Sequence, residues 1–480
     1  MERVAENQSL RLLTLGRRGA WIVVVLAACA GCVEDNTTSG EVAVAESYDF
    51  ETASYAGQTH RHLLISELKG YVSGLTDRID GGQYMPTNTD EVVDSLDFYF
   101  RFDSDSDGET AFTKTGALPL LETTFNDVAR NKDLVSKLAG NDTVTDHKCW
   151  SATDTCASSE FEGWPGVESP ESLVSLFFAM VADNAIARAN GELDWDVHLT
   201  AEGHDLNQLI EKFLTVAIAF SQGADDYLDS DVDGKGLRAS NTVPEDGGYT
   251  DLAHAWDEGF GYFGAARNYG DYTDDEIASK GGREEWQGCH DTNGDEMLSL
   301  LSECNFGASV NAAKRDRGSA AEAATDFTQD IFDAFLAGRA LIRDNPGPLD
   351  DAQLATLEGY RDTIVWGWEK VYAATVVHYI NDVIVDMAAV GTDAYSFADH
   401  AKHWSELKGF ALGFQFSPRS PLSDQDFVAF HAYVGAAPVL TGVDALAAYK
   451  TDLLSARALL RDAYDFDAAN MGDEDGLGGW

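Results

Sequence analysis

Apolar residues at intervals of three and four recur through almost the whole chain from residue 60 onward. In one stretch they stand at Leu206, Leu209 and Phe213. Residues at this spacing share one face of a helix, so each such stretch predicts an amphipathic helix that packs against others. Patterns typical of strands are nearly absent, and the sequence therefore predicts a mainly α-helical protein. We expect helices in the ranges 60–80, 171–190, 204–222, 250–266, 309–343, 352–388, 395–414, 423–434 and 442–465.

Two acidic, glycine-rich stretches interrupt the helical pattern, at 91–160 and 223–249. Such a composition is typical of loops or insertions. Within the first stretch, the aromatic run Phe98–Phe102 is interpreted as either a short strand or an apolar anchor. Pro346 and Pro348 separate two long helical ranges, because proline cannot continue a helix.

Two segments of the chain echo each other, His254–Gly261 and His403–Phe410. Each has a His three or four residues before a Glu, a Trp two residues before that Glu, and a Gly-Phe pair soon afterwards. The echo predicts an internal duplication with two packed antiparallel helical bundles. The alternative is a chance similarity between two helices of an aromatic-rich protein. On the first interpretation, residues 48–270 form one bundle with insertions, 309–470 form the second, and 271–308 form a loop between them.

The N-terminus has the pattern of a secretion signal. Arginines precede the apolar run Trp21–Ala28, which is too short to span a membrane. The run ends in Leu26-Ala27-Ala28-Cys29, which is similar to the lipobox of bacterial lipoproteins, where cleavage precedes a lipid-modified Cys. We expect removal of residues 1–28, lipidation of Cys29 and a flexible tether over 29–47. An ordinary cleaved signal with an incidental Cys is the alternative.

The protein is strongly acidic, with 82 acidic residues against 33 Lys and Arg and a formal net charge of −49. Such a surface repels nucleic acid, which we exclude as a partner. Most of the charge is interpreted as adaptation to a saline habitat, and individual acids are considered as ligands only where their spacing indicates it. Together with the signal, this composition predicts a lipoprotein of the cell envelope, attached to the outer membrane through its N-terminal lipid.

Six cysteines fall into three pairs. The pairs are Cys29 and Cys32, Cys149 and Cys156, and Cys289 and Cys304. The first pair belongs to the signal region, where Cys32 is the poorer candidate for lipidation. An exported protein enters an oxidising compartment, so the other two pairs are expected to form disulfides. Each would close a short loop and brace it.

Three acidic loops place oxygen-bearing side chains at alternate positions, starting at Asp103, Asp229 and Asp291. Alternation at positions one, three and five directs three side chains at one centre, as in EF-hand calcium loops. None has the acid expected at position twelve, so a solvated acidic turn is the alternative for each. The third loop is the best candidate, because Glu303 lies one place past that position. The calcium ligands expected there are Asp291, Asn293, Asp295, Met297 through its carbonyl, and Glu303.

The two echoing segments also predict a transition-metal site. Imidazole and carboxylate groups suit iron and zinc, and a His and a Glu at this separation share a helix face. The expected ligands are His254 and Glu258 on one helix and His403 and Glu406 on the other, with His400 as a spare. If the two pairs share one site, the protein is an exported metal-binding lipoprotein, with iron considered before zinc.

Two other functions compete with transition-metal binding. Glu258 and Glu406 are read alternatively as buried structural acids, with Trp256 and Trp404 in the core. The protein would then be a non-enzymatic, partner-binding surface lipoprotein with calcium-stabilised loops. A metallopeptidase that uses His403 and Glu406 is the third possibility. The chain has no His-Glu-x-x-His helix, no Gly-x-Ser-x-Gly elbow and no phosphate-binding Gly loop, which disfavours an enzyme.

The other histidines and the one basic cluster are interpreted as structural. His378 stands among apolar residues and is expected in the core. Positions at helix starts or on the surface are expected for His60, His62 and His204. Ion pairs with local acids are expected for Lys314, Arg315 and Arg317.

Most of residues 48–465 resembles a family of bacterial lipoproteins called domain of unknown function 4856. Segments that carry the resemblance include Tyr48–Glu51, Gln208–Lys212, Trp256–Gly264, Asn311–Asp316 and Trp404–Phe410. The family has no assigned reaction. Its members accompany imelysin-like proteins, which are helical, exported and linked to iron uptake. The resemblance therefore implies a two-bundle helical fold and partners among the envelope proteins of iron acquisition.

The imelysin motif Gly-x-His-x-x-Glu is matched at one of the two echoing segments. His403 and Glu406 fit it, with Ala401 in place of the Gly. The other segment fits loosely, with Asp257 three residues after His254. Through this similarity the resemblance implies a metal site at the same histidines that the spacing indicates.

Overall fold

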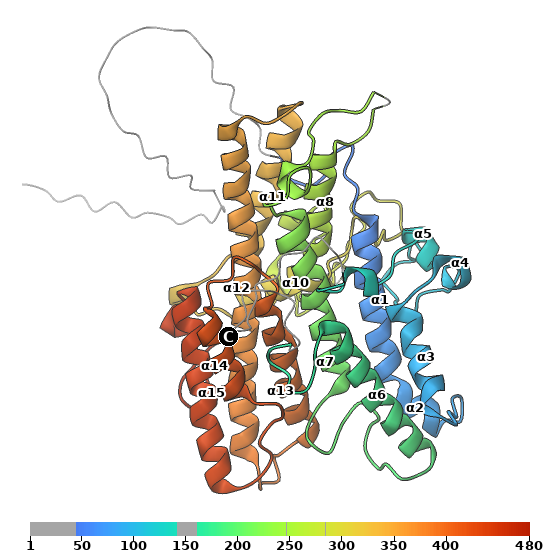
Figure 1. Ribbon diagram of the computed structural model, residues 1–480, viewed down its shortest axis with the longest axis vertical. Helices are drawn as coiled ribbons and strands as arrows, with labels where there is room; N and C mark the ends of the chain where they lie inside the picture. The colour runs from blue at the N-terminus through green and yellow to red at the C-terminus, as the bar shows by residue number, and fades with distance from the viewer. Residues whose placement is uncertain (1–44, 142–160, 246, 284) are drawn as a thin grey trace, which may run out of the picture. The chain divides into compact units, whose positions relative to one another are not determined.

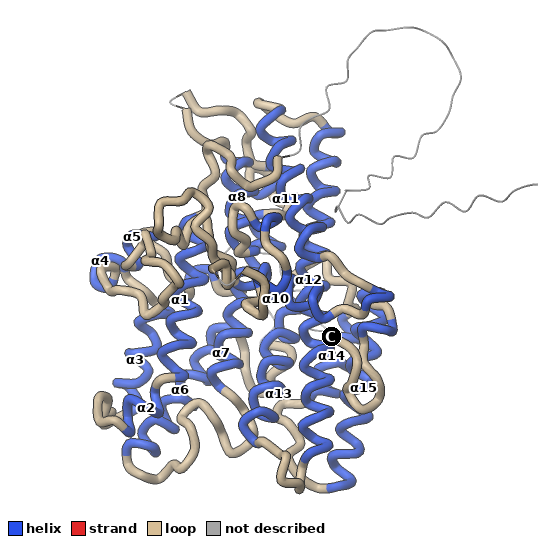
Figure 2. The backbone as a smooth tube through the Cα atoms, turned by 180° about the vertical axis from the view of Figure 1, so that it is seen from behind, coloured by secondary structure: helices blue, strands red, loops and turns tan. Residues whose placement is uncertain are grey.

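A computed structural model of the protein confirms the helical periodicity (Figure 1) and describes residues 45–141, 161–245, 247–283 and 285–480. Every range expected to be helical contains a helix, and the described residues form isolated β-bridges but no β-strand (Figure 2). The longer helices are α1 (Ala56–Ser73), α3 (Thr89–Phe100), α6 (Pro170–Ala189), α7 (Leu206–Leu214), α8 (Asp251–Phe263), α10 (Gly307–Gly318), α11 (Phe327–Asp344), α12 (Asp351–Ala389), α13 (Phe397–Ala411), α14 (Asp424–Val434) and α15 (Val443–Tyr464). The shorter ones are α2 (Leu75–Asp80), α4 (Ser104–Asp107), α5 (Phe125–Val128) and α9 (Asp274–Ile277).

Short 3₁₀ turns connect several of these helices. They are η1 (Val135–Lys137), η4 (Gly236–Arg238), η5 (Tyr269–Asp271), η6 (Ala321–Ala323), η7 (Leu412–Gln415) and η8 (Ala468–Asn470). Beyond α7, the chain continues helically as two π-helical segments, η2 (Thr215–Phe220) and η3 (Gln222–Tyr227). A Cβ added to Gly223 would lie 2.6 Å from the ring of Trp368, so the close approach of η3 to α12 requires a glycine there.

The long helix α12 is the element around which the others pack. It begins after Asp350, whose side chain accepts a hydrogen bond from the Gln353 N–H at 2.9 Å and whose own N–H donates to Gln353 Oε1 at 2.9 Å. This capping box satisfies two amides at the helix start. In both views, α11 lies along the upper part of α12 and α13 along its lower part (Figures 1 and 2). α10 and α15 also contact α12.

Helices from the two predicted bundles pack directly on one another. α7 packs against α13, and α8 packs against α11, so elements before residue 270 share an interface with elements after residue 309. The chain from Val44 to Trp480 forms one compact unit. Within it, packed helices are present as expected, but the internal duplication is not confirmed.

Two of the predicted boundaries are wrong. The run Phe98–Phe102 is not a strand, because α3 extends to Phe100, but Phe100 and Phe102 are buried in the core as an apolar anchor would be. Asn88 starts this helix by accepting a hydrogen bond from the Glu91 N–H at 3.1 Å, and residues four apart on one face, ending with Phe100, are buried. The expected single helix over 309–343 is two helices, since α10 ends at a glycine and α11 begins nine residues further along the chain.

One described helix, α6, is long and apolar enough by composition to span a membrane. Its N-cap Ser169 accepts a hydrogen bond from the Ser172 N–H at 3.1 Å, and proline occupies the first helical position. Leu173, Phe177 and Val181 are fully buried on one face. That face packs against α2, α3 and α7, so we interpret α6 as a helix of the packed body.

Candidate functional site: a buried charge cluster

Five helices place charged and polar side chains beside one another, and we call this group the charge cluster. Its members are Lys69 of α1, Glu211 and Lys212 of α7, Lys314 and Arg315 of α10, Tyr379 of α12 and Glu406 of α13. Three of these helices carry segments on which the family resemblance rests, Gln208–Lys212, Asn311–Asp316 and Trp404–Phe410. Segments far apart in the sequence therefore meet at one place.

Small residues on α13 let this helix approach α7 closely. A Cβ added to Gly409 would lie 2.7 Å from the Cβ of Lys212, so a larger residue would push the two helices apart. One turn earlier, Ser405 Oγ accepts a hydrogen bond of 2.8 Å from the N–H of Asp205, the N-cap of α7. These two contacts set α13 against α7 and bring Glu406 beside Lys212.

Glu211 and Lys212 are held as an ion pair within the cluster. Glu211 Oε2 lies 2.6 Å from Lys212 Nζ and 2.5 Å from Lys69 Nζ. Burial opposes the charged form of Glu211, but the two ammonium groups outweigh it and lower its pKa to about 2. Lys212 Nζ also lies 3.6 Å from Glu406 Oε1. Glu211 and Lys212 therefore satisfy their charges inside the protein.

Arg315 has no comparable partner. The residue is 7% exposed, and its Nε and Nη1 are buried with no hydrogen-bond acceptor among the described residues. Burial lowers the pKa of Arg315 to about 10, while the nearby Tyr379, Asp382 and Glu406 act in the opposite direction. Glu406 is 4% exposed, and its Oε2 is buried with no donor at hydrogen-bond distance in the described part of the chain, although Lys402 Nζ forms a long ion pair with it at 4.0 Å. Unpaired buried polar groups of this kind are costly.

Lys314 adds a further cation beside Arg315. Burial is the main cause that lowers the pKa of Lys314 to about 8, and the positive charges of Lys212 and Arg315 act in the same direction. The cluster thus combines four cationic side chains with two carboxylates, in a protein whose net charge is −49. Local positive charge together with unused guanidinium donors fits an anion, because Arg pairs with carboxylate and phosphate groups in defined geometry.

A histidine–carboxylate group borders the cluster on α12 and α13. His403 Nδ1 lies 2.8 Å from Asp386 Oδ2, and its Nε2 lies 3.9 Å from Asp382 Oδ2. Burial opposes protonation of His403, but the hydrogen bond to Asp386 and the charge of Asp382 outweigh it and raise its pKa. His378 Nε2 lies 3.4 Å from the same Asp382 oxygen. His378 is therefore a partly exposed partner of a carboxylate, and its predicted place in the core is wrong.

The structure does not bring the two predicted His-Glu pairs together. α8 packs against α1, α10 and α11, whereas α13 packs against α7 and α12 (Figures 1 and 2). His254 Nε2 lies 3.7 Å from Glu258 Oε2, and Glu258 Oε1 accepts a hydrogen bond of 2.8 Å from Gln58. His403 and Glu406 instead contact Asp386 and Lys212. Among the described residues, no group of three or more His, Cys, Asp or Glu side chains is arranged to hold a metal ion.

The three histidines expected at helix starts or on the surface are all buried, although His204 does lie at a helix start, directly before the N-cap of α7. His60 packs against two phenylalanine rings, and His62 and His204 donate hydrogen bonds to backbone carbonyls. Burial lowers the pKa of His60 to about 3 and that of His62 to about 4, so both rings are neutral. His400, the spare ligand, is fully buried, and its Nδ1 lies 3.3 Å from the hydroxyl of Tyr395. The surface prediction is wrong because aromatic rings and carbonyls provide partners for a neutral imidazole.

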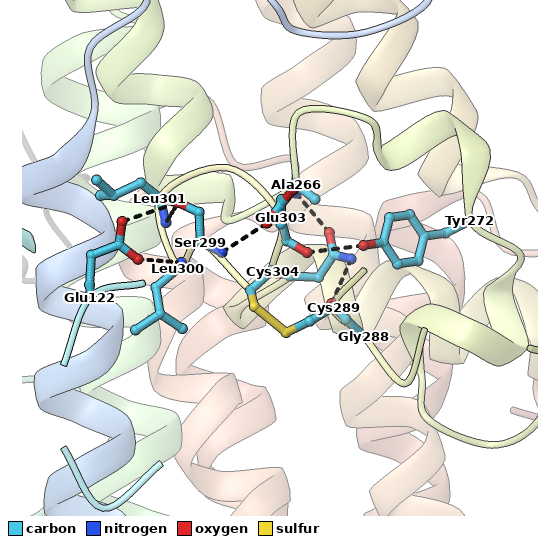
Figure 3. The surroundings of a disulfide bond; sticks show 11 residues. Glu122, Ala266, Tyr272, Gly288, Cys289, Ser299, Leu300, Leu301, Glu303 and Cys304 are labelled. Carbon is cyan, nitrogen blue, oxygen red and sulfur yellow. Dashed lines mark hydrogen bonds between the residues drawn. A yellow bond between two sulfur atoms is a disulfide. The ribbon is translucent and has the colours of Figure 1, made fainter. Parts of the chain in front are cut away.

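The loop at 291–303 is closed by the predicted disulfide Cys289–Cys304 (Figure 3). Glu303, next to this bridge, is 2% exposed. Its Oε1 accepts a hydrogen bond of 2.9 Å from the Thr292 N–H, and its Oε2 accepts one of 2.8 Å from the Ser299 N–H. The carboxylate therefore ties the start of the loop to its end.

The polar side chains inside this loop accept hydrogen bonds from its own backbone. Asp291 Oδ2 accepts a hydrogen bond of 2.8 Å from the Glu296 N–H, Asn293 Oδ1 accepts one of 2.8 Å from the Asp295 N–H, and Asp295 Oδ1 accepts one of 2.9 Å from the Met297 N–H. Glu296, at position six, has a φ of 66°, the left-handed conformation that glycine supplies in EF-hand loops. The backbone thus reaches the required turn without glycine.

The other predicted sites have different outcomes. Asp103 accepts a hydrogen bond of 2.9 Å from the Asp105 N–H and starts α4, and Asp229 is buried in an ion pair with Arg419. A helix begins directly after Asp103 and Asp229 is held by a cation, so we keep only the loop at 291–303 as a calcium candidate. The signal region with Cys29 and Cys32, and the predicted pair Cys149–Cys156, lie outside the described residues.

Sequence reasoning missed most of the charge cluster. Of the three basic residues near 315, Arg317 pairs with Asp275, an acid 42 residues earlier in the chain, and Arg315 does not pair with a local acid. The sequence did contain a signal for this cluster. Basic residues are scarce, with 33 Lys and Arg against 82 acidic residues, so basic residues that stand next to each other indicate a possible site. Lys212 and Arg315 both lie in segments that carry the resemblance, yet periodicity alone does not show that these segments meet.

The comparison with known families gives one match. The family model of a domain of unknown function, DUF4856, matches residues 126–281, a span that includes α6, α7 and α8. No curated protein and no solved structure matches the chain significantly. The match supports the resemblance to the DUF4856 family over the segment that supplies Glu211 and Lys212 to the charge cluster.

Proposed function

We propose that this protein is an exported, lipid-anchored binding protein that captures a small anionic solute at Arg315 in the charge cluster. The single observation that carries the proposal is the buried guanidinium of Arg315, whose Nε and Nη1 find no acceptor in the described part of the chain. The nearby Lys314 and Lys212 add positive charge. A carboxylate or phosphate group bound there would supply the missing acceptors.

The remaining cluster residues would position this anion. Glu211 and Glu406 hold Lys212 in place, so its ammonium group is already ordered beside the site before an anion binds. Pre-organised cations bind an anion more tightly because less side-chain entropy is lost on binding. Because Glu406 Oε2 also lacks a hydrogen-bond donor among the described residues, a ligand with both an acidic group and a donor fits the cluster best.

Calorimetric titration of the purified protein with inorganic phosphate and with succinate tests the proposal. We expect at least one of the two anions to bind, and Arg315→Met to weaken that binding by about tenfold or more, since a hydrogen bond to a charged group contributes about 1.5–3 kcal/mol. Arg317→Met is the matched control, because Arg317 lies on the same helix but its side chain is 48% exposed and pairs with Asp275.

Stability measurements distinguish loss of the anion site from unfolding of the Arg315→Met variant. Replacing a buried, unpaired charge by a side chain of similar length should leave the protein at least as stable, so Arg315→Met is expected to unfold at equal or higher urea concentration. Failure of the unmodified protein to bind either anion, or equal binding by Arg315→Met, would contradict the proposal. Loss of binding in Arg317→Met as well would indicate a general charge effect.

The lipid anchor and the export are part of the same proposal. The lipobox-like Leu26-Ala27-Ala28-Cys29 and the disulfide Cys289–Cys304, which suits an oxidising compartment, support it. We expect Cys29→Ser to release an unlipidated, soluble form from the outer membrane. Metabolic labelling with a radioactive fatty acid measures this directly, and continued labelling of Cys29→Ser would assign the lipid to another residue such as Cys32.

Calcium binding at the loop 291–303 is a second candidate, favoured by the alternate spacing of its oxygen-bearing side chains and by the left-handed Glu296. We propose that calcium bound by Asp291, Asn293 and Asp295 braces this loop. At a hundredfold excess over the dissociation constant, binding to the folded state alone would add about 2.7 kcal/mol of stability. Thermal unfolding with calcium and with chelator should differ in the parent protein, and Asp291→Ala should remove the difference.

Iron or zinc binding stays a prediction from the sequence. It derives support from the imidazole and carboxylate side chains of α13, where His403 contacts Asp386 and approaches Asp382. Elemental analysis of the purified protein measures it without assuming a site. If His403→Ala loses the iron or zinc and His254→Ala keeps it, the metal is bound at α13. If both variants lose the metal, the predicted shared site is supported.

A further inference from the structure

A cavity of about 630 Å³ lies between the segment 161–168 and α14. Its walls are mixed: Phe161, Trp164 and Val167 lie on one side and Val428 on the other, while carboxylates, an imidazole and backbone form the rest. The volume suits a small organic molecule, and the Trp164 ring offers it an aromatic surface on which to pack. None of these residues belongs to the charge cluster.

A buried lysine lies behind the lining of this cavity, in contact with two of the lining residues. Lys408 of α13 is 1% exposed, and its Nζ donates hydrogen bonds to the Gly435 carbonyl oxygen at 2.8 Å and to His431 Nδ1 at 3.1 Å. Both Gly435 and His431 line the cavity. Lys408 Nζ also lies 6.0 Å from the ring centroid of Trp164 on the cavity wall. The amine therefore lies close to three residues of the cavity lining.

Lys408 lacks the carboxylate partner that a buried ammonium group needs. No acid of the described residues forms an ion pair with it, whereas the half-buried Lys212 on the neighbouring helix has two. Burial alone lowers the pKa of Lys408 to about 7. His431 is 7% exposed, and its Nδ1 accepts the hydrogen bond from Lys408. Lys408 thus lacks a counter-charge beside an open space.

We propose that this cavity is a second ligand site, independent of the anion at Arg315, and that it binds a small monocarboxylate with an apolar body. The carboxylate would pair with Lys408, and the apolar body would pack on Trp164. A negative charge at this position offsets the desolvation of the ammonium group, which a neutral ligand cannot do. The carboxylates Glu162 and Glu168 line the cavity as well, so a cationic ligand held by them is the alternative.

Titration with 3-phenylpropionate, its neutral amide and 3-phenylpropylamine distinguishes these ligands, because the three share one apolar body and differ in charge. We expect the unmodified protein to bind the acid at least about tenfold more tightly than the amide. Lys408→Met should remove this preference. Lys402→Met is the matched control, because Lys402 lies on the same helix with a side chain that is 44% exposed, and it should keep the preference.

The pH dependence provides a readout that needs no variant. The acid should bind more weakly as the pH rises from about 6 to about 9, because Lys408 loses its proton in this range and the ion pair is lost with it. The other ionisable groups near this amine are His431, His204, Glu162 and Glu168, and the difference between the parent and Lys408→Met isolates the amine from them.

A cavity-filling variant keeps the test decisive if Lys408→Met fails to fold. Ala432 lines the cavity and is exposed on α14, so Ala432→Leu should preserve the fold while it obstructs the apolar body of the ligand. We expect it to weaken binding of the acid. Tighter binding of the amine than of the acid, equal binding of acid and amide, or unchanged binding by Ala432→Leu would each overturn the proposal.

Discussion

The echoing segments of α8 and α13 share their packing residues and differ in their polar contacts. Trp256 of α8 and Trp404 of α13 are both fully buried, and each indole N–H crosses to a neighbouring element. Trp256 donates to the Phe335 carbonyl at 3.0 Å, and Trp404 donates to the Tyr449 hydroxyl at 2.9 Å. In both helices the tryptophan therefore acts as an anchor in the core.

The glycines of the two segments also serve the same purpose. A Cβ added to Gly259 would lie 2.8 Å from the side chain of Leu228, and one added to Gly409 would lie 2.7 Å from the Cβ of Lys212. Each glycine permits a close approach of two helices. The common part of the echo is therefore explained by helix packing, without a shared metal site.

The two helices differ in the contacts of their polar residues. Asp257 of α8 is fully buried, accepts hydrogen bonds from the Tyr48 hydroxyl at 2.7 Å and from Arg339 Nε at 2.8 Å, and has all of its charge paired. On α13, Glu406 and Lys408 are buried but incompletely paired among the described residues. Satisfied buried charges stabilise a fold, whereas unsatisfied ones are retained where a ligand completes them. The pattern on α8 is therefore explained by packing and ion pairing, whereas α13 carries two groups on which the proposed binding sites depend.

The largest expected effect is on Asp257. Asp257→Ala leaves the guanidinium of Arg339 buried and unpaired, and removal of one partner of a buried ion pair costs about 3–5 kcal/mol of stability. Glu406→Gln should cost much less, because Lys212 keeps its contact with Glu211. Urea unfolding of both variants measures the contrast. Similar losses in the two variants would mean that α13 is as structural as α8.

The helices themselves were predictable from sequence because their apolar spacing persists over many residues. Ranges such as 171–190 and 352–388 lie within about two residues of α6 and α12. The strand interpretation of the aromatic run Phe98–Phe102 was wrong, because this run includes the end of α3. There the polar cap at Asn88 and the four-residue spacing of buried side chains determined a helix. Aromatic residues suit both structures, so local composition does not decide between them.

The candidate site was less predictable because it depends on which helices meet. The sequence identified Glu406 by its motif, but its partner Lys212 lies in another helix almost two hundred residues earlier. Whether Arg315 pairs with a neighbouring acid is decided by the direction of its side chain, and spacing alone favoured pairing. The disulfide Cys289–Cys304 was predictable, since its cysteines are close in sequence and the N-terminal pattern predicts export.

The second prediction concerns the glycines that the two helices share. Gly259→Ala and Gly409→Ala should each destabilise the protein by about 1–3 kcal/mol, because the added methyl group meets a neighbouring side chain at under 3 Å. Gly409→Ala should also weaken phosphate or succinate binding, since it displaces Lys212 from the charge cluster. Calorimetry with both variants tests this. Weaker anion binding in Gly259→Ala at equal stability would remove the proposed difference between the helices.

The third prediction tests whether the two helices begin alike. Thr250 Oγ1 accepts a hydrogen bond of 3.0 Å from the Ala253 N–H at the start of α8, and Ser396 Oγ accepts one of 3.1 Å from the Asp399 N–H at the start of α13. Replacement of either cap by Ala should cost about 1 kcal/mol. Thermal unfolding should therefore show similar losses for Thr250→Ala and Ser396→Ala, with anion binding retained in both.

The smallest expected effect is a pH dependence that belongs to α13. His403 has a raised pKa in the folded protein, since its hydrogen bond to Asp386 and the charge of Asp382 outweigh the opposing effect of burial. A group whose pKa is higher folded than unfolded stabilises the fold fully below its unfolded pKa, near 6.5, and this contribution is lost as the pH rises through the folded value. The free energy of unfolding should therefore fall with rising pH over this window.

Lys314 and Lys408 have lowered pKa values, so they raise the stability of the fold as the pH rises further, in the opposite direction to His403. The contribution of His403 is therefore measured as the difference between the parent protein and a His403 variant. We expect His403→Gln to remove the fall in stability near neutral pH, and Asp386→Asn to reduce it while the imidazole stays in place. Denaturant unfolding at several pH values measures both variants. If the parent and His403→Gln show parallel pH profiles, the contact between His403 and Asp386 does not favour the charged imidazole, and the polar side of α13 resembles that of α8 after all.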